Sequence, residues 1–318
     1  MTQRFLIAKQ KGEKHNMTKT TKRNWKRLGL TAGLGLGVSL IAAGCGATED
    51  TASMEDTVGK GQEIELAYVE WDDAVATNHV VAQVLEDLGY DVTLTPLDNA
   101  IMWEAVSTGE ADAMLSAWLP GTHAAQLEEY GDKMVDLGGN LEGAKIGLAV
   151  PAYMDVDSIA DLTDQAGKSI TGIEPGAGIV AAAENALTGY PNLSDWAIET
   201  SSSGAMTVTL GQAIENEEEI IITAWNPHWK FSAYDLKYLD DPNGIFGGEE
   251  TVHTMVREGL ETDMPEAYQV LDQFHWTIED VEALMLQIYE GESAEDAAAA
   301  FVEANPDLVA EWTAGVAK

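Results

Sequence analysis

Two stretches of the chain share one pattern, in which a mostly apolar run ends at a Trp and a Pro follows two residues later. The first reads ADAMLSAWLPGTH over 111–123, and the second reads IIITAWNPHW over 220–229. A short apolar run that ends at a proline is typical of a strand buried on both faces. Each run therefore predicts a strand with Trp118 or Trp225 at its carboxyl end. A third tryptophan, Trp71, closes the earlier run IELAYVEW.

Between these runs the apolar positions alternate between strand-like and helical spacing. The first unit has predicted strands over 64–71, 91–96 and 111–118, and predicted helices over 74–89, closing on Gly89, and 99–108. The second has predicted strands over 169–173, 196–201 and 219–225, and predicted helices over 178–188 and 205–216. Further helices are predicted from about 122 and about 228. Two βαβαβ units predict an α/β fold of two lobes, each a mostly parallel sheet flanked by helices, with a ligand cleft between the strand ends.

Two stretches between the units, 145–151 and 251–257, are candidates for the crossings between the lobes. We therefore expect lobe 2, over 149–253, to be an insertion in lobe 1. Lobe 1 then comprises 63–148 and 254–318, with helices in the C-terminal part returning to it.

The N-terminal 44 residues differ in composition from the rest, with a basic segment followed by a glycine-rich apolar run that ends at Cys45. This pattern predicts a secretory signal over 1–44. Cys45 is the only cysteine, and its place resembles the lipobox of bacterial lipoproteins. We expect a diacylated Cys45 that anchors the protein at the outer face of the cytoplasmic membrane, with a flexible tether over 45–62. An uncleaved membrane helix is the alternative, which the short, glycine-interrupted run disfavours.

The chain after this leader is strongly acidic. The leader holds 9 of the 17 Lys and Arg residues and 1 of the 54 Asp and Glu residues, which leaves 8 basic and 53 acidic residues and a formal charge of −45. Such a surface repels nucleic acid and anionic membranes, and it argues against both as direct partners. The charge favours solubility, and it also fits a saline or alkaline habitat in which salt screens the repulsion.

Three tryptophans at strand ends that face one cleft favour a binding role over core packing. A quaternary ammonium group has no N–H to donate, so a cage of aromatic faces can hold it without a carboxylate partner. The turn EPGAGI, over 174–179, places glycines where a helix begins, and its free backbone N–H groups predict a site for a small anion such as a carboxylate. Neither a dinucleotide fingerprint nor a Walker motif is present, and the histidines lack metal-ligand spacing.

Four segments resemble one protein family. They are AYVEWDDAVATNHVVAQVLEDLGYDVTLT, MWEAVSTGEADAMLSAWLPGTH, TGIEPGAGI and IIITAWNPHWKFSAYDLKYLDDP. Segment by segment they are similar to the substrate-binding lipoproteins of osmoprotectant ABC importers, which take up glycine betaine and proline betaine. The resemblance covers nearly all of 63–318. It implies a type II periplasmic-binding-protein fold, a monomer and a binding role without cofactor, metal or catalysis.

The resemblance also implies which residues contact the ligand. The cage around the trimethylammonium group would consist of Trp71, Trp118 and Trp225. The carboxylate would be held by the backbone amides of Gly178 and Ile179 and by the side chain of His123. An anion favours a protonated imidazole, so betaine affinity is expected to fall as the pH rises through the titration of this histidine. His228 and Trp229 are expected to be structural residues on the following helix.

The predicted function is extracellular capture of glycine betaine, with proline betaine as a second ligand, and delivery to an ABC permease. The implied partners are the transmembrane subunits of the permease and, through them, a cytoplasmic ATPase. A receptor for choline or carnitine is an alternative that the cage residues do not distinguish. An alternative of another class is a secreted lipoprotein hydrolase, but the sequence lacks a Gly-x-Ser-x-Gly motif, a His-Glu-x-x-His motif and a free catalytic thiol.

Overall fold

The computed structural model describes residues 57–316. The predicted signal, Cys45 and most of the predicted tether lie outside the described residues. The strands are β1 (Glu63–Tyr68), β2 (Asp91–Pro96), β3 (Ala113–Leu119), β4 (Met134–Pro151), β5 (Ser169–Gly172), β6 (Ala197–Thr200), β7 (Ile222–Asn226), β8 (Leu236–Tyr238) and β9 (Glu250–Arg257). The helices are α1 (Asp72–Asp87), α2 (Asn99–Thr108), α3 (Ala124–Tyr130), α4 (Gly178–Gly189), α5 (Ser203–Glu215), α6 (Lys230–Ala233), α7 (Leu260–Asp263), α8 (Pro265–Gln273), α9 (Ile278–Tyr289), α10 (Ala294–Ala304) and α11 (Pro306–Trp312).

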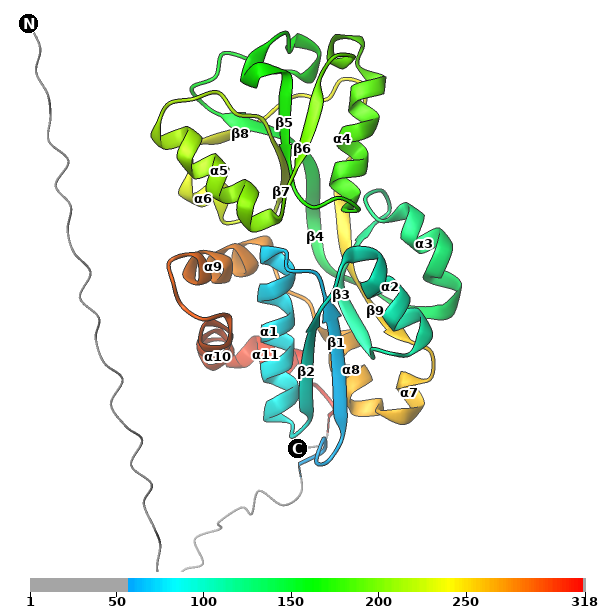
Figure 1. Cartoon of the computed structure of the whole chain (residues 1–318). Coiled ribbons are helices and arrows are strands. Elements are labelled where there is room, and N and C mark those ends of the chain that lie inside the picture. The colour runs from blue at the N-terminus through cyan, green and yellow to red at the C-terminus, as the bar shows by residue number, and fades with distance from the viewer. Residues whose placement is uncertain (1–56, 317–318) are drawn as a thin grey trace, which may run out of the picture. The chain divides into compact units, whose positions relative to one another are not determined.

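The strands pair in the order β2-β1-β3-β9-β4-β7-β5-β6, with β8 also on β4. Within this path β2-β1-β3 and β6-β5-β7 are parallel and have equivalent orders, because each unit places its first strand between its second and third. The two predicted βαβαβ units are therefore present, one in each lobe, and the antiparallel pairings of β4, β8 and β9 make the sheet mixed. Figure 1 shows β4 running from one lobe into the other.

The long strand β4 is where the chain first passes between the lobes. Residues 134–144 of β4 pair with β9 in lobe 1, whereas 145–149 pair with β7 in lobe 2. The chain returns at β9, which lies between β3 and β4. The expected crossing stretches thus lie inside paired strands. We therefore propose crossings at 144–145 and just before Glu250, a few residues earlier than predicted from the sequence.

Helix α1 shows how the local sequence sets these elements. Asp72 and Asp73 occupy its first turn, where the helix dipole favours negative charge. The helix stops before Gly89, which has φ of 94° in the left-handed region that favours glycine. Its apolar face packs on β1 and β2 and against α9 and α10. Because β1 ends at Tyr68, Trp71 lies at the N-cap of α1 and not, as predicted, at the end of the strand.

The C-terminal helices pack on the lobe 1 helix α1. Helices α8, α9 and α10 pack against α1, and α11 packs against α8 and α10. Trp312 is fully buried in this layer, and its indole N–H donates to the carbonyl of His275 at 2.7 Å. Over 57–316, none of the helices is both long and apolar enough to cross a membrane.

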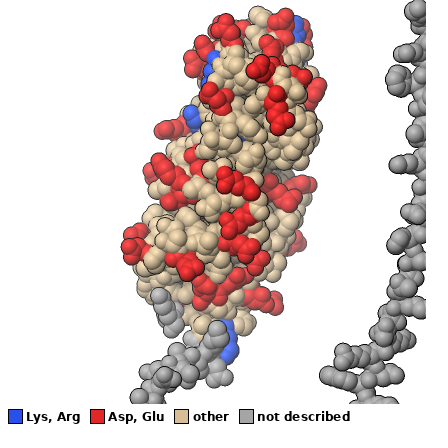
Figure 2. All heavy atoms as spheres, turned by 90° about the vertical axis from the view of Figure 1, so that its left-hand side faces the viewer, with Lys and Arg blue, Asp and Glu red and all other residues tan. Residues whose placement is uncertain are grey.

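Acidic side chains cover much of the face shown in Figure 2, and basic side chains are few there. Mutual repulsion between these carboxylates opposes the compact state, and added salt screens charges that lie beyond about 10 Å at 0.1 M. We therefore expect the thermal midpoint of unfolding to climb as NaCl is raised from low to molar concentration. Differential scanning fluorimetry over that range measures this effect. A midpoint that does not change with salt would contradict it.

Candidate ligand-binding site

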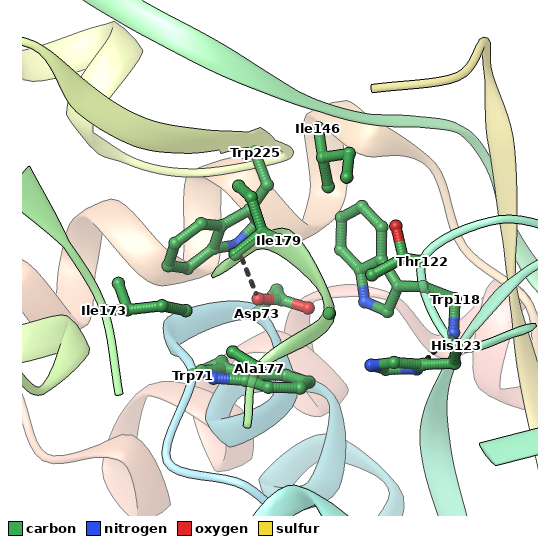
Figure 3. Close-up of a pocket in the computed structure, with 11 residues that line it drawn as sticks. Trp71, Asp73, Trp118, Thr122, His123, Ile146, Ile173, Ala177, Ile179 and Trp225 are labelled. Atoms are coloured by element: carbon green, nitrogen blue, oxygen red, sulfur yellow. Dashed lines mark hydrogen bonds between the residues drawn. The ribbon is translucent and has the colours of Figure 1, made fainter. Parts of the chain in front are cut away.

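A pocket lies between residues of the two lobes and has a volume of about 310 Å³ including its mouth (Figure 3). All the residues that the sequence predicts to contact the ligand line it. The complete lining is Trp71, Asp73, Trp118, Thr122, His123, Ile146, Ile173, Ala177, Gly178, Ile179 and Trp225.

The three predicted cage tryptophans reach the pocket from three different elements. Trp71 is the N-cap of α1, and Trp118 and Trp225 are the penultimate residues of β3 and β7. Each is at most 6% exposed, and Figure 3 shows their rings around a common space. Trp118 and Trp225 therefore occupy equivalent positions in the two units, as predicted. The indole N–H of Trp225 donates to the carboxylate of Asp73 at 2.9 Å.

His123 presents a neutral N–H donor to the pocket. Its Nδ1 accepts a hydrogen bond from the backbone N–H of Trp118 at 3.0 Å, so the ring proton belongs on Nε2. Nε2 is buried and has no hydrogen-bond partner within the described chain. Burial lowers the pKa of His123 to about 3. The imidazole is therefore neutral at ordinary pH, because burial keeps water away from the ring. This differs from the titrating imidazolium that we expected from the sequence.

Hydrogen bonds from the loop after β3 explain how His123 is positioned. Glu250, the first residue of β9, is 5% exposed and accepts hydrogen bonds from the backbone N–H groups of Gly121 at 2.6 Å and Thr122 at 2.7 Å. The hydroxyl of Thr122 donates to the same carboxylate. His123 also stacks on Trp71, with ring centroids 5.7 Å apart and planes at 20°. Glu250 thus holds the loop through hydrogen bonds, and Trp71 packs against the ring of His123.

The start of α4 forms the side of the pocket that belongs to lobe 2. Gly178 and Ile179 are its first two residues, and the first N–H groups of a helix have no partner within the helix. Gly178 also makes a close approach to lobe 1, since a Cβ built on it would lie 2.3 Å from the carbonyl oxygen of Thr122. A side chain at this position is incompatible with the observed separation of the two lobes.

Asp73 is a pocket residue that the sequence analysis missed. Its carboxylate lies between Trp225 and Trp71 in Figure 3, and the residue is 4% exposed. Burial, with a smaller contribution from the charge of Asp72, raises the pKa of Asp73 to about 6. The pocket thus combines the three predicted rings with a carboxylate that the sequence did not lead us to expect. The acidic pair that directly follows Trp71 was the available signal, because it places a carboxylate one or two residues after a predicted cage tryptophan.

A second cluster of charged and aromatic side chains surrounds Asp72, next to the pocket. Its Oδ1 accepts the indole N–H of Trp229 at 2.6 Å, and its Oδ2 lies 3.3 Å from Nε2 of His228. Burial raises the pKa of Asp72, but these neighbours outweigh burial and lower it to about 2. Lys230 is fully buried, with Nζ 4.0 Å from the ring centroid of Trp225. His228 and Trp229 precede α6 and contact Asp72 of lobe 1. They therefore connect the two lobes in addition to packing within lobe 2.

The fold and the pocket define a class, the two-lobed proteins that enclose a small ligand between two α/β lobes. Here rings and a carboxylate suit a cation, and N–H donors suit an anion. No group of three or more His, Cys, Asp or Glu within 57–316 is placed to hold a metal ion. Residues 62–304 match the OpuAC family, the substrate binding domain of ABC-type glycine betaine transport systems. The chain belongs to this family.

Solved structures and a curated relative agree with this assignment. Lactococcal OpuAC, solved in a closed conformation with glycine betaine, is 51% identical with a TM-score of 0.78, over 79% of this chain and 99% of that one. An ABC-transporter choline binding protein, solved with choline, is 28% identical with a TM-score of 0.75, over 80% and 92%. The glycine betaine/carnitine transport binding protein GbuC of Listeria monocytogenes is 48% identical over 164 residues. That match spans 51% of this chain and about half of GbuC, 54% of its length. The predicted type II periplasmic-binding-protein fold is confirmed.

Proposed function

We propose that this protein captures glycine betaine outside the cytoplasmic membrane and delivers it to an ABC permease. The observation that carries the proposal is the polarity of one pocket. Three tryptophan rings and the carboxylate of Asp73 offer a place for a trimethylammonium group. The free Nε2–H of His123 and the N-terminus of α4 offer donors for a carboxylate. A ligand that carries both groups satisfies both ends.

The wider assembly follows from this role. The partners are the transmembrane subunits of the permease, coupled to a cytoplasmic ATPase, and the protein acts as a monomer. A lipid on Cys45, with 45–62 as a tether, would keep it near the permease. Binding without turnover is part of the proposal, and mass spectrometry of glycine betaine after incubation with the protein tests it. A changed mass of the ligand would favour the hydrolase alternative.

Choline and carnitine are the second candidates, because Asp73 can stabilise a cation that lacks a carboxylate. A carboxylate close to a trimethylammonium group supplies attraction that does not depend on the other end of the ligand. Carnitine keeps a carboxylate but is longer, and choline has only a hydroxyl. A titration series of glycine betaine, proline betaine, carnitine and choline ranks these ligands. If choline bound most tightly, the proposed ligand would be choline and not glycine betaine.

Replacement of the cage tryptophans is expected to weaken glycine betaine binding without unfolding the protein. Each cation–π contact contributes roughly 0.5 to 2 kcal/mol in a desolvated site. We therefore expect Trp118→Ala or Trp225→Ala to raise the Kd by roughly two- to thirtyfold. Trp→Tyr should lose less at either position. Titration calorimetry measures the Kd, and far-UV circular dichroism is the control. A collapsed spectrum would mean that these rings are needed for the core.

Glycine betaine affinity is expected to fall as the pH drops through the pKa of Asp73, which burial raises to about 6. Above this pKa the ionised carboxylate attracts the ammonium group, and below it the neutral acid does not. The His123 ring remains neutral throughout, because its pKa lies at about 3. Calorimetry between about pH 5 and pH 8 should therefore show a rising affinity that levels off.

Asp73→Asn is the matched control for this pH dependence. The amide keeps an oxygen acceptor for the indole N–H of Trp225 but removes the charge. The pH dependence should disappear in this variant. An unchanged pH profile in Asp73→Asn would assign the dependence to another group.

A further inference from the structure

Three consecutive residues at the start of α1 each bond to lobe 2. In every case an indole N–H donates to a carboxylate across the cleft. The pairs are Trp71 with Glu174 at 2.5 Å, Trp229 with Asp72 at 2.6 Å, and Trp225 with Asp73 at 2.9 Å. The start of α1 is thus a main point of polar contact between the lobes in this closed arrangement.

Two of these bonds involve rings that line the pocket, and they run in opposite directions. Trp71 belongs to lobe 1, and the carboxylate that holds its N–H belongs to Glu174 of lobe 2. Trp225 belongs to lobe 2, and the carboxylate that holds its N–H belongs to Asp73 of lobe 1. Each of the two rings is therefore oriented by a residue of the opposite lobe.

The third ring behaves differently. Trp118 lies in β3 of lobe 1, and its bond to His123 joins the backbone N–H of Trp118 to a neighbour in the same lobe. Within 57–316, no hydrogen bond to lobe 2 holds its indole. The orientation of Trp118 is thus set inside lobe 1, whereas those of Trp71 and Trp225 depend on the other lobe.

We propose that Glu174 and Asp73 are positioning residues that complete the aromatic cage only when the lobes close. This inference rests on the proposed binding of a quaternary ammonium ligand. A tryptophan whose N–H is bonded to a carboxylate is fixed in one rotamer, and the anion at its edge increases the electron density of the ring face. Both effects favour a cation above the ring. The ligand is consequently held most strongly in the closed state, which slows its release.

Glu174 gives the sharper test, because it does not line the pocket. Asp73 lines the pocket and can attract the ligand directly. Its removal would therefore change both this attraction and the orientation of Trp225. Any effect of Glu174 on ligand binding is expected to pass through Trp71. Phenylalanine at position 71 keeps an aromatic face but lacks the N–H, so it removes the proposed connection without removing the ring.

The experiment is a double-mutant cycle with the full chain, measured by titration calorimetry and stopped-flow fluorescence with glycine betaine. We expect Glu174→Ala to raise the Kd by about three- to tenfold, mainly through faster dissociation. Glu174→Gln, which keeps an acceptor, should recover part of the loss. In a Trp71→Phe background, Glu174→Ala should cause no further loss. Glu184→Ala is the charge-matched control, because Glu184 is an exposed residue of α4 outside the pocket.

Two outcomes would overturn the inference while leaving the proposed function intact. One is full additivity of Glu174→Ala and Trp71→Phe, which would mean that Glu174 acts independently of the ring. The other is an equal loss in Glu184→Ala, which would mean that only the total charge matters. Absence of glycine betaine binding by the unsubstituted protein would overturn the proposed function and this inference together.

Discussion

Gly178→Ala is expected to weaken glycine betaine binding by about ten- to a hundredfold or more, while leaving the fold intact. The new Cβ would lie 2.3 Å from the carbonyl oxygen of Thr122 and 2.6 Å from its Cγ2. Because Gly178 and Thr122 belong to different lobes, the clash can be relieved by holding the lobes apart. Overpacking of this kind costs roughly 1 to 3 kcal/mol, and here the cost falls on the closed state alone. The loss should therefore appear in ligand affinity and not in the stability of the free protein.

Titration calorimetry and thermal unfolding with and without glycine betaine test this separation. The midpoint of the free protein should stay unchanged, and the stabilisation by ligand should shrink. Gly204→Ala is the matched control, because Gly204 lies in α5 of the same lobe and a Cβ there meets no atom within 4 Å. Native affinity in Gly178→Ala would show that the approach to Thr122 does not limit closure.

His123→Ala is expected to weaken ligands that carry a carboxylate far more than those that do not. The lost hydrogen bond would join the buried Nε2–H to a charged carboxylate, and such bonds contribute roughly 1.5 to 3 kcal/mol. Glycine betaine should thus bind about ten- to a hundredfold more weakly. Choline keeps the trimethylammonium group but has a hydroxyl in place of the carboxylate, so weak choline binding should change much less.

Calorimetric titrations of both ligands against both proteins provide this comparison. His275→Ala is a suitable control, since His275 is exposed and lies outside the pocket. His123 also packs against the rings of Trp71 and Trp103, so a general loss of shape would affect both ligands. Equal losses for glycine betaine and choline would show that His123 shapes the pocket and does not contact the carboxylate.

Much of the fold could be predicted because each βαβαβ unit is regular. The strand over 91–96 and the helix over 99–108 have the predicted bounds, since apolar periodicity and flanking turn residues agree there. Strand β4 was missed because its first half, MVDLGGNLEGA, contains glycines and charged residues instead of an apolar run. Its place is set by pairing with β9, a contact between segments far apart in the sequence. The positions of the crossings depend on that pairing.

The roles of some site residues could be predicted from the sequence better than those of others. Trp118 and Trp225 lie at strand ends, so their shared pocket follows from the topology. The roles of Asp73 and Glu174 depend on how the two lobes meet, which no local pattern encodes. The protonation of His123 depends on complete burial and on one backbone N–H that occupies Nδ1. Side chains whose roles arise from the closed arrangement are therefore the ones that sequence patterns miss.

The most direct test of the account is a calorimetric comparison of glycine betaine with glycine and choline. Glycine shares the carboxylate but lacks the three methyl groups, and choline shares the methyl groups but lacks the carboxylate. A pocket that uses both ends should bind glycine betaine at one site per chain, choline more weakly, and glycine without measurable heat. No binding of glycine betaine, or binding of glycine with equal affinity, would contradict the proposed site.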